Sequence, residues 1–224
     1  MPTNYYTAQA VRELDRLAIE QYGIPGFTLM QRAGKAAFDA LCKRWPNLKQ
    51  LIVCCGTGNN GGDGFVIAAL AQQTGLRVEV YLVGQLASIK GNAARALDLA
   101  KSWQVPIHES AEFPGEFTKN DTVVVDALLG TGLKGEVRSP YRTMIEAINR
   151  SGLPVLAVDI PSGLCSDTGV VLGSCVKAAM TVTFIGHKLG LVSGAGPALA
   201  GEVVFDTLQV PPEIYRKVAP VRVE

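Results

Sequence analysis

Glycines and polar side chains are interleaved in the segment CCGTGNNGGDG, residues 54–64. Gly56, Gly58 and Gly61 have the G-x-G-x-x-G spacing of a dinucleotide-binding turn, where a glycine backbone and the free N–H groups of a helix start bind phosphate. Three amide or carboxyl side chains stand among these glycines: Asn59, Asn60 and Asp63. They either cap the following helix or line a binding site. Their number in so short a segment favours the binding site.

Two common nucleotide sites do not fit this segment. A dinucleotide-binding domain carries an acidic residue about 20 positions after the glycines. The corresponding stretch YLVGQ, Tyr81–Gln85, has no carboxylate, and Glu79 is expected at the surface in mid-strand. A P-loop carries Lys and then Ser or Thr after its last glycine, and no such pair follows here. The sequence also has no Tyr-x-x-x-Lys pair, so it disfavours a conventional NAD(P)-dependent oxidoreductase.

Polar residues also follow three other apolar runs. Asp126 ends the run VVVD and precedes the glycine-bearing loop Gly130–Glu136. Asp159 ends VLAVD and begins DIPSG, in which proline fixes the turn and Ser162 follows. Lys188 lies in GHKLG after the run TVTFI. This lysine either binds a phosphate as a point charge or lies solvated at the surface, and the sequence leaves both interpretations open.

The polar residues at these run ends offer oxygen atoms as ligands. Carboxylate, amide and hydroxyl oxygens suit a hard cation. His108 and His187 have no partner at metal-binding spacing, and the five cysteines include no C-x-x-C. A site for a thiolate- or imidazole-bound metal is therefore not indicated.

A parallel sheet would bring these polar residues together. Runs such as LIVCC and VLAV are apolar without alternation, which is typical of strands buried on both faces. Strand and helix patterns alternate along the chain, which predicts an α/β fold with three α/β/α layers, Rossmann-like, around a mainly parallel, doubly wound sheet. Such sheets bind ligands at the carboxyl ends of their strands. The predicted strands are Leu51–Cys55, Arg77–Val83, Thr122–Asp126, Pro154–Asp159, Ala179–Ile185 and Glu202–Phe205.

Two helices are expected before the first of these strands. The segment Thr7–Tyr22 has an apolar stripe at helical spacing, and a second helix is expected over Leu29–Arg44. Because the first helix lies outside the strand–helix alternation, it either covers the sheet or contributes to a dimer. A third helix is expected to begin near Gly64, after the glycine-rich loop.

Composition limits the classes of protein that the chain can represent. Its 224 residues are 48% hydrophobic and 18% charged, which is enough for one domain spanning residues 1–224. A net charge of +1, from 21 basic and 20 acidic residues, gives no electrostatic footprint for nucleic acid. No apolar run approaches the roughly 20 residues of a membrane span. The odd number of cysteines and the polar amino terminus predict a cytoplasmic location.

Four segments together resemble one known family. GTGNNGGDG, VVDALLGTGLKG, AVDIPSGL and TFIGHKLGL follow LDRLAIEQYGIPGFTLMQRAG in the order and spacing of the YjeF amino-terminal family, the NAD(P)H-hydrate epimerases. The resemblance runs from about Thr7 to Phe205. It implies an isomerase that interconverts the R and S forms of NADHX and NADPHX, hydrated at C6 of the reduced ring. It also implies a K⁺ cofactor, a homodimer, and a separate or fused dehydratase that repairs the S form. The chain is then a free-standing epimerase or a domain excised from a fusion.

The resemblance also implies roles for individual residues. Asn59, Asn60, Gly61, Gly62 and Asp63 would line the substrate loop. The segment Gly130, Thr131, Gly132, Leu133, Lys134, Gly135 and Glu136 would wrap the substrate phosphates with backbone N–H groups. The K⁺ ligands from side chains would be Asn60, Asp126 and Ser162, and Lys188 is a further substrate contact to consider. Many relatives read LME where this chain has Gln31, to which no role is assigned.

Asp159 is the first choice for the catalytic group, and Asp63 is the second, as its partner or orienter. Loss of the C6 hydroxyl as water leaves a cation stabilised by the ring nitrogen, and water returning to the opposite face gives the other epimer. A carboxyl group with a tuned pKa suits both proton transfers. Ring opening at the C6–nitrogen bond is the alternative route, and a non-catalytic nucleotide-binding scaffold is the alternative function.

Overall fold

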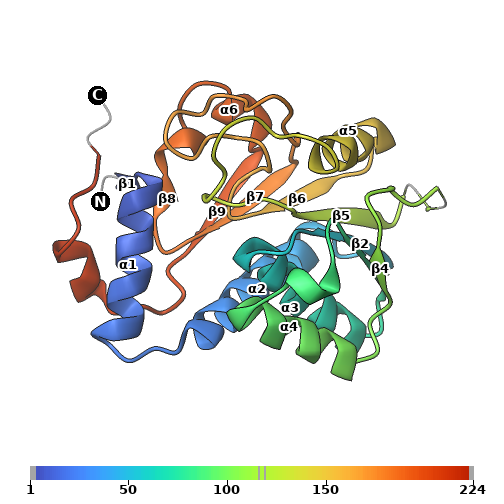
Figure 1. Ribbon diagram of the computed structural model, residues 1–224, viewed down its shortest axis with the longest axis horizontal. Helices are drawn as coiled ribbons and strands as arrows, with labels where there is room; N and C mark the ends of the chain where they lie inside the picture. Colours follow the sequence, from blue (N-terminus) through green and yellow to red (C-terminus); the bar gives the residue numbers. More distant parts are fainter. Residues whose placement is uncertain (1–3, 116, 119, 222–224) are drawn as a thin grey trace.

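A seven-stranded sheet crosses the centre of the computed structural model, which describes residues 4–115, 117–118 and 120–221 (Figure 1). Its strand order is β4-β3-β2-β5-β6-β7-β9, and every neighbouring pair is parallel. The chain runs outward from β2 to β4, returns to β5 beside β2, and continues outward to β9. The strands are β2 (Gln50–Cys55), β3 (Arg77–Leu82), β4 (Ile107–Glu109), β5 (Thr122–Ala127), β6 (Val155–Val158), β7 (Met180–Phe184) and β9 (Glu202–Asp206).

The predicted doubly wound sheet is confirmed, and it is parallel throughout. Every predicted strand is present, although Pro154 and Asp159 lie outside β6. Strand β4 was not predicted, because its three residues, IHE, are partly or fully exposed at an edge and carry no apolar run. The reversal of strand order lies between β2 and β5, so the glycine-rich turn and the loop after β5 meet at the usual ligand position of this architecture.

Helices cover both faces of the sheet, and successive side chains of each central strand point alternately to one helical layer and to the other. Leu51 and Val53 of β2 belong to one core with α2, α3 and α4, whereas Ile52 and Cys54 belong to a second core with α5. The helices of these layers are α2 (Gly26–Arg44), α3 (Asn59–Gln73), α4 (Gly91–Ser102), α5 (Tyr141–Ser151) and the short α6 (Gly196–Leu199). Three 3₁₀ turns accompany them: η1 (Leu86–Ser88), η2 (Leu189–Leu191) and η3 (Pro212–Arg216).

Helix α1 (Ala8–Glu20) stands beside the three layers, next to η3 (Figure 1). The Thr7 hydroxyl caps it by accepting a hydrogen bond from the N–H of Ala10. A two-stranded parallel sheet of β1 (Tyr5–Tyr6) and β8 (His187–Lys188) leads into it. The predicted apolar stripe of α1 is buried in the main core of the same chain, so this helix covers one end of the sheet.

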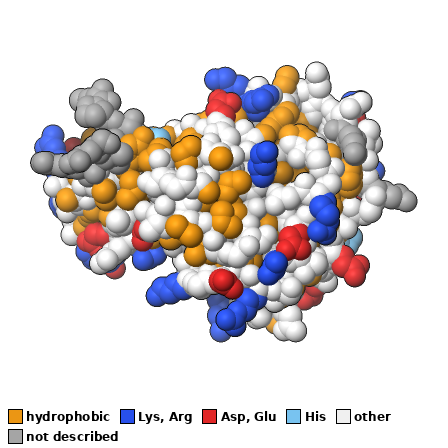
Figure 2. All heavy atoms as spheres, turned by 90° about the horizontal axis from the view of Figure 1, so that it is seen from above, with side chains coloured by type: hydrophobic (Ala, Val, Ile, Leu, Met, Phe, Trp, Pro, Cys, Tyr) orange, Lys and Arg blue, Asp and Glu red, His pale blue; other side chains and the backbone are white. Residues whose placement is uncertain are grey.

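The surface agrees with the balanced charge of the sequence. On the face seen in Figure 2, basic and acidic side chains are interspersed. Among the helices of the described residues, none combines the length and hydropathy that crossing a membrane requires.

Candidate active site

The glycine-rich segment is mostly helical. Only the stretch from Gly56 to Gly58 forms the turn after β2, and α3 begins at Asn59. The prediction that this helix starts near Gly64 is therefore wrong. The N-cap is Gly58, which has no capping side chain, so the two asparagines and Asp63 are not caps. The first hydrogen bond of the helix runs from the N–H of Gly62 to the carbonyl of Gly58, at 3.0 Å. The N–H groups that precede Gly62 therefore have no partner within the helix.

Close backbone approaches explain two of the glycines. A Cβ on Gly56 would lie 2.0 Å from the carbonyl oxygen of Leu128, and a Cβ on Gly61 would lie 1.9 Å from the carbonyl oxygen of Gly56. A Cβ on Gly62 would lie 2.6 Å from the Met30 side chain of α2. Gly61 and Gly62 are buried and do not line the cavity described next. These glycines let the start of α3 pack tightly against its surroundings.

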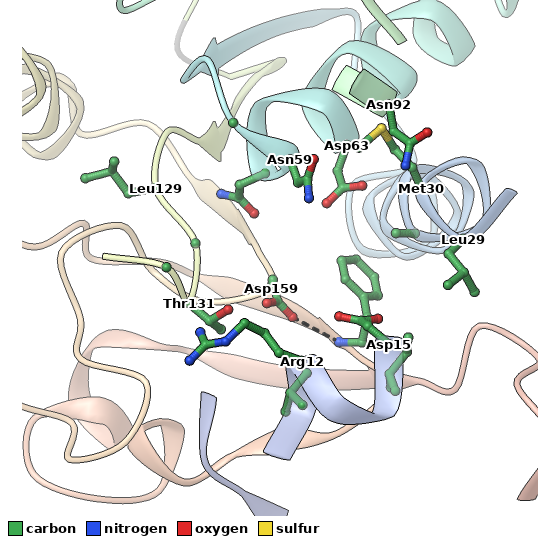
Figure 3. Close-up of a pocket in the computed structure, with 18 of the residues that line it drawn as sticks. Arg12, Asp15, Leu29, Met30, Asn59, Asp63, Asn92, Leu129, Thr131 and Asp159 are labelled. Carbon is green, nitrogen blue, oxygen red and sulfur yellow. Dashed lines mark hydrogen bonds between the residues drawn. The ribbon is translucent and has the colours of Figure 1, made fainter. Parts of the chain in front are cut away.

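A cavity of about 670 Å³ opens at the carboxyl edge of the sheet (Figure 3). The predicted residues that line it come from four separate parts of the chain: Asn59, Asn60 and Asp63 of α3, the segment 130–134 after β5, Asp159 after β6, and Lys188 of β8. Gly135 and Glu136, at the end of the predicted phosphate loop, are exposed and lie outside the lining. Gln31 is exposed on α2 and also lies outside it.

Asp159 and Lys188 form an ion pair in the floor of this cavity. Lys188 is only 1% exposed, so the interpretation of this residue as a solvated surface lysine is wrong. Its ammonium group also donates to the carbonyl of Phe184 at 2.8 Å. The same Asp159 oxygen accepts from the N–H of Phe184 at 3.2 Å and from the Thr183 hydroxyl at 3.3 Å.

The backbone of Asp159 is also unusual. Its φ of 68° lies in the left-handed region, which is uncommon for a residue other than glycine, although aspartate is among the side chains that tolerate it. Backbone conformations of this kind gather at functional sites, where the surroundings hold them. Here the hydrogen bonds from β7 and the ion pair with Lys188 fix the carboxylate at the cavity floor.

Asp63 has a different electrostatic environment. Burial raises the pKa of Asp63 well above its usual range, the negative charges of Asp159 and Asp15 raise it further, and Lys188 opposes them. The neutral, proton-carrying form of Asp63 is therefore favoured. Two carboxyl groups in one cavity thus differ in environment: Asp159 is paired with a lysine, whereas burial favours the protonated form of Asp63.

Asp126 and Ser162 lie outside the cavity lining, below the loop that follows β5. Both are fully buried. The Asp126 carboxylate accepts hydrogen bonds from the Ser162 hydroxyl at 2.6 Å, the Ser162 N–H at 2.8 Å and the Leu128 N–H at 3.3 Å. Burial raises the pKa of Asp126 to about 6, and the hydrogen bonds from Ser162 and Leu128 oppose this shift. The Ser162 oxygen in turn accepts from the N–H of Leu129 at 2.8 Å.

Residues 26–190 match the sequence model of a family described as YjeF-related protein N-terminus. This chain belongs to that family. A bifunctional NAD(P)H-hydrate repair enzyme, Nnr, from Coxiella burnetii is 49% identical over 96% of this chain, which spans 43% of that relative's length. An NAD(P)H-hydrate epimerase from Limosilactobacillus fermentum is 38% identical over 88% of this chain and 93% of its own length. The crystal structure of the yeast protein YNL200c has the same fold, with a TM-score of 0.80 at 20% identity, covering 100% of this chain and 97% of that one.

Asn60 carries a buried polar group without a partner in the described part of this YjeF-family protein. The Asn60 amide nitrogen is buried and has no hydrogen-bond partner among the described residues. Rotating the amide by half a turn would place its oxygen at that buried position. Gly130 packs against this amide, and the neighbouring Leu129 is bonded to Ser162 and, through it, to Asp126. Within the described part of the chain, no three His, Cys, Asp or Glu side chains gather in a way that could hold a metal ion.

Two charged residues of the cavity were not predicted from the sequence. Arg12 and Asp15 of α1 line the cavity, and Figure 3 shows both beside the labelled residues of the sheet edge. A signal for Asp15 was present, because it lies next to Leu14 in the stripe that α1 buries. An acidic residue bordering an apolar helical stripe needs a partner or a function. No sequence pattern marks Arg12 in this way.

Proposed function

We propose that this protein is an NAD(P)H-hydrate epimerase, which interconverts the R and S forms of NADHX and NADPHX. One observation carries the proposal: Asp63 of α3 and Asp159, which follows β6, meet in one cavity in different electrostatic environments. The name and 93% length coverage of the Limosilactobacillus fermentum relative support the same activity.

The proposed chemistry begins at the C6 hydroxyl. A proton from Asp63 allows the hydroxyl to leave as water, and the lone pair of the ring nitrogen then stabilises the cation at C6. The Asp159 carboxylate, fixed beside Lys188, provides a preorganised negative charge for this cation. Water then adds to the opposite face of C6. Because Asp63 carries the proton, it is better suited than Asp159 to be the acid of this reaction.

The surroundings of the cavity suggest how the substrate binds. We expect its phosphates near the start of α3 and the loop 130–134, because unpaired N–H groups of a helix start attract anions. Lys134 and Arg12 are exposed cations at the same cavity and would add positive charge there. This orientation directs the hydrated ring to Asp63 and Asp159.

A K⁺ ion would be held by Asn60, Asp126 and Ser162. Its charge would offset part of the phosphate charge, and it would tie the start of α3 to the loop after β5. Asp126 and Ser162 already support this loop through Leu129. We assign these residues the task of fixing the loop geometry.

The S epimer formed by this reaction could be the substrate of a second repair enzyme. The relative of this chain from Coxiella burnetii is named a bifunctional repair enzyme and is more than twice as long as the matched part. We propose that the S form passes to an NAD(P)H-hydrate dehydratase, fused or separate. The cytoplasmic location and the homodimer stay predictions from the sequence.

Direct measurement of the two epimers tests the proposed activity. The purified chain would be incubated with acid-hydrated NADH or NADPH, with and without K⁺, and the R and S forms would be separated by chromatography. We expect conversion well above the spontaneous rate, and a large loss of conversion with Asp63→Asn. A folded wild-type chain that matches the spontaneous rate would refute the proposal.

A further inference from the structure

A third carboxyl group, that of Asp15, faces the cavity from the wall opposite Asp63. In Figure 3, Asp63 points into the cavity from α3 and Asp15 points into it from α1, with Asp159 beside them. The three groups are close enough to influence one another. The charge of Asp15 raises the pKa of Asp63, and the charge of Asp159 raises the pKa of Asp15.

Folding does not explain why α1 has an acid at this position. Within the described part of the chain, Asp15 accepts no hydrogen bond and forms no ion pair, whereas Glu13 on the same helix pairs with Arg16 at 2.7 Å. Burial raises the pKa of Asp15 to about 6, which means that its charged form is poorly solvated. A poorly solvated acid without a protein partner, in a cavity, is a candidate for a functional group.

The Asp159 carboxylate is held in place by protein donors. One of its oxygens already accepts from three donors: Lys188, Phe184 and Thr183. Asp63, on the other wall, is favoured as the proton donor. Asp15 is the remaining carboxyl group of the cavity lining, and among the described residues no donor occupies its oxygens.

We propose that Asp15 is a catalytic residue that serves the face of the substrate ring opposite to the face served by Asp63. This inference rests on the epimerase function proposed above. It assigns one carboxyl group to each face of C6, so that each face has its own group to donate or accept the proton when water leaves or returns.

The proton and electron movements balance in this scheme. Asp63 transfers its proton to the C6 hydroxyl, the C6–oxygen bond breaks towards oxygen, and the nitrogen lone pair forms a C=N bond. A water molecule on the Asp15 side then bonds to C6, the C=N electrons return to nitrogen, and the Asp15 carboxylate takes the water proton. Asp63 is left ionised and Asp15 protonated, which is the starting state for the reverse reaction.

Oxygen exchange separates this role from a structural one. One epimer would be incubated in H₂¹⁸O, and both epimers would be separated and analysed for label by mass spectrometry. In Asp15→Asn we expect epimerisation to fall about 100-fold, the usual order for loss of an acid or base. The rate at which ¹⁸O enters the unconverted epimer should fall less than tenfold relative to wild type, because Asp63 can still release and return water on its own face of the ring.

Matched variants make the result specific. Glu13→Gln, on the same helix but ion-paired and half-exposed, should leave epimerisation and exchange unchanged. Asp15→Glu should recover part of the epimerisation, and thermal unfolding would verify the fold of each variant. The assignment would be overturned if Asp15→Asn lost oxygen exchange and epimerisation to the same extent. It would also be overturned if the wild type epimerised the substrate without incorporating ¹⁸O, because that result indicates ring opening. A wild-type chain without either activity would instead refute the epimerase function itself.

Discussion

The two walls of the cavity differ in how their polar groups are held. On the sheet side, Asp159 follows β6 and accepts hydrogen bonds and an ion pair, and Asp126 of β5 accepts hydrogen bonds just below the cavity lining. On the α1 side, Asp15 reaches the cavity without a protein partner among the described residues. The wall that carries Asp159, here called the sheet wall, is thus held by the contacts of the folded core. The wall that carries Asp15, here called the α1 wall, packs against that core.

The attachment of α1 is local. Strand β1 pairs with β8, and the N–H of Ala8 donates to the Asp167 carboxylate at 2.6 Å. Because β8 also contains Lys188, the position of α1 is linked to the ion pair at the cavity floor. The comparison therefore predicts that changes in the sheet wall alter stability and chemistry together, whereas changes at Asp15 alter chemistry and leave the fold intact.

The largest effect is expected at Asp159. Asp159→Asn removes the fixed charge beside the cation, and epimerisation should fall about 10²–10³-fold, as for loss of one preorganised electrostatic contact. Lys188 would also be left buried without its partner, which costs on the order of 3–5 kcal/mol in the free energy of unfolding. Epimer chromatography and urea unfolding of the same preparations would measure both effects.

A double variant separates the two effects. Asp159→Asn with Lys188→Met removes the unpaired charge, so the free energy of unfolding should largely recover while epimerisation stays low. Near-normal turnover of Asp159→Asn would remove this carboxylate from the chemistry. It would also break the contrast between the two walls.

An intermediate effect is expected at Asp126, which supports the sheet wall from below. Asp126→Asn removes a charge and an acceptor for the Ser162 N–H and hydroxyl. We expect the K⁺ concentration for half-maximal epimerisation to rise about tenfold, equivalent to about 1.4 kcal/mol. Titration with K⁺ at constant ionic strength measures this, with Ser162→Ala as the matched variant. An unchanged K⁺ dependence in both would place the ion elsewhere.

The sheet wall was predictable from the sequence because strand ends carry a local signal. An apolar run fixes the strand, and the residue that ends it lies at the ligand-binding edge of a parallel sheet. Asp126 and Asp159 were found in this way, and their elements are confirmed. The start of α3 was predicted too late because glycine has a low helix propensity, which tertiary packing of Gly62 against Met30 and of Gly64 against Cys55 overrides.

The α1 wall could not be derived in the same way. Its helix was predicted, but nothing local indicates that it stands at the open edge of the sheet, since that position depends on the pairing of β1 with β8 across the length of the chain. Lys188 lies in the two-residue strand β8, which is too short to show a recognisable sequence pattern. Its burial and its ion pair with Asp159 therefore became evident only from the structure.

The smallest effect concerns stability at Asp15. Its pKa is about 6 in the folded protein against the ordinary 3.8, so the folded state binds a proton more tightly than the unfolded chain does. The stabilisation from this proton is present below about pH 4 and is lost as pH rises to about 6. The difference between these two pKa values corresponds to at most about 3 kcal/mol in the free energy of unfolding, and contact with solvent in the cavity reduces this to about 1–2 kcal/mol.

Asp15→Asn removes this penalty of the charged form. Relative to wild type, the variant should gain about 1–2 kcal/mol in the free energy of unfolding at pH 8 and nothing at pH 4, while losing epimerisation. Urea unfolding at the two pH values measures the difference, and Glu13→Gln on the exposed side of α1 controls for a general charge effect. A loss of stability at pH 8 would mean that Asp15 supports the fold like the sheet-wall acids, and the distinction between the two walls would fail.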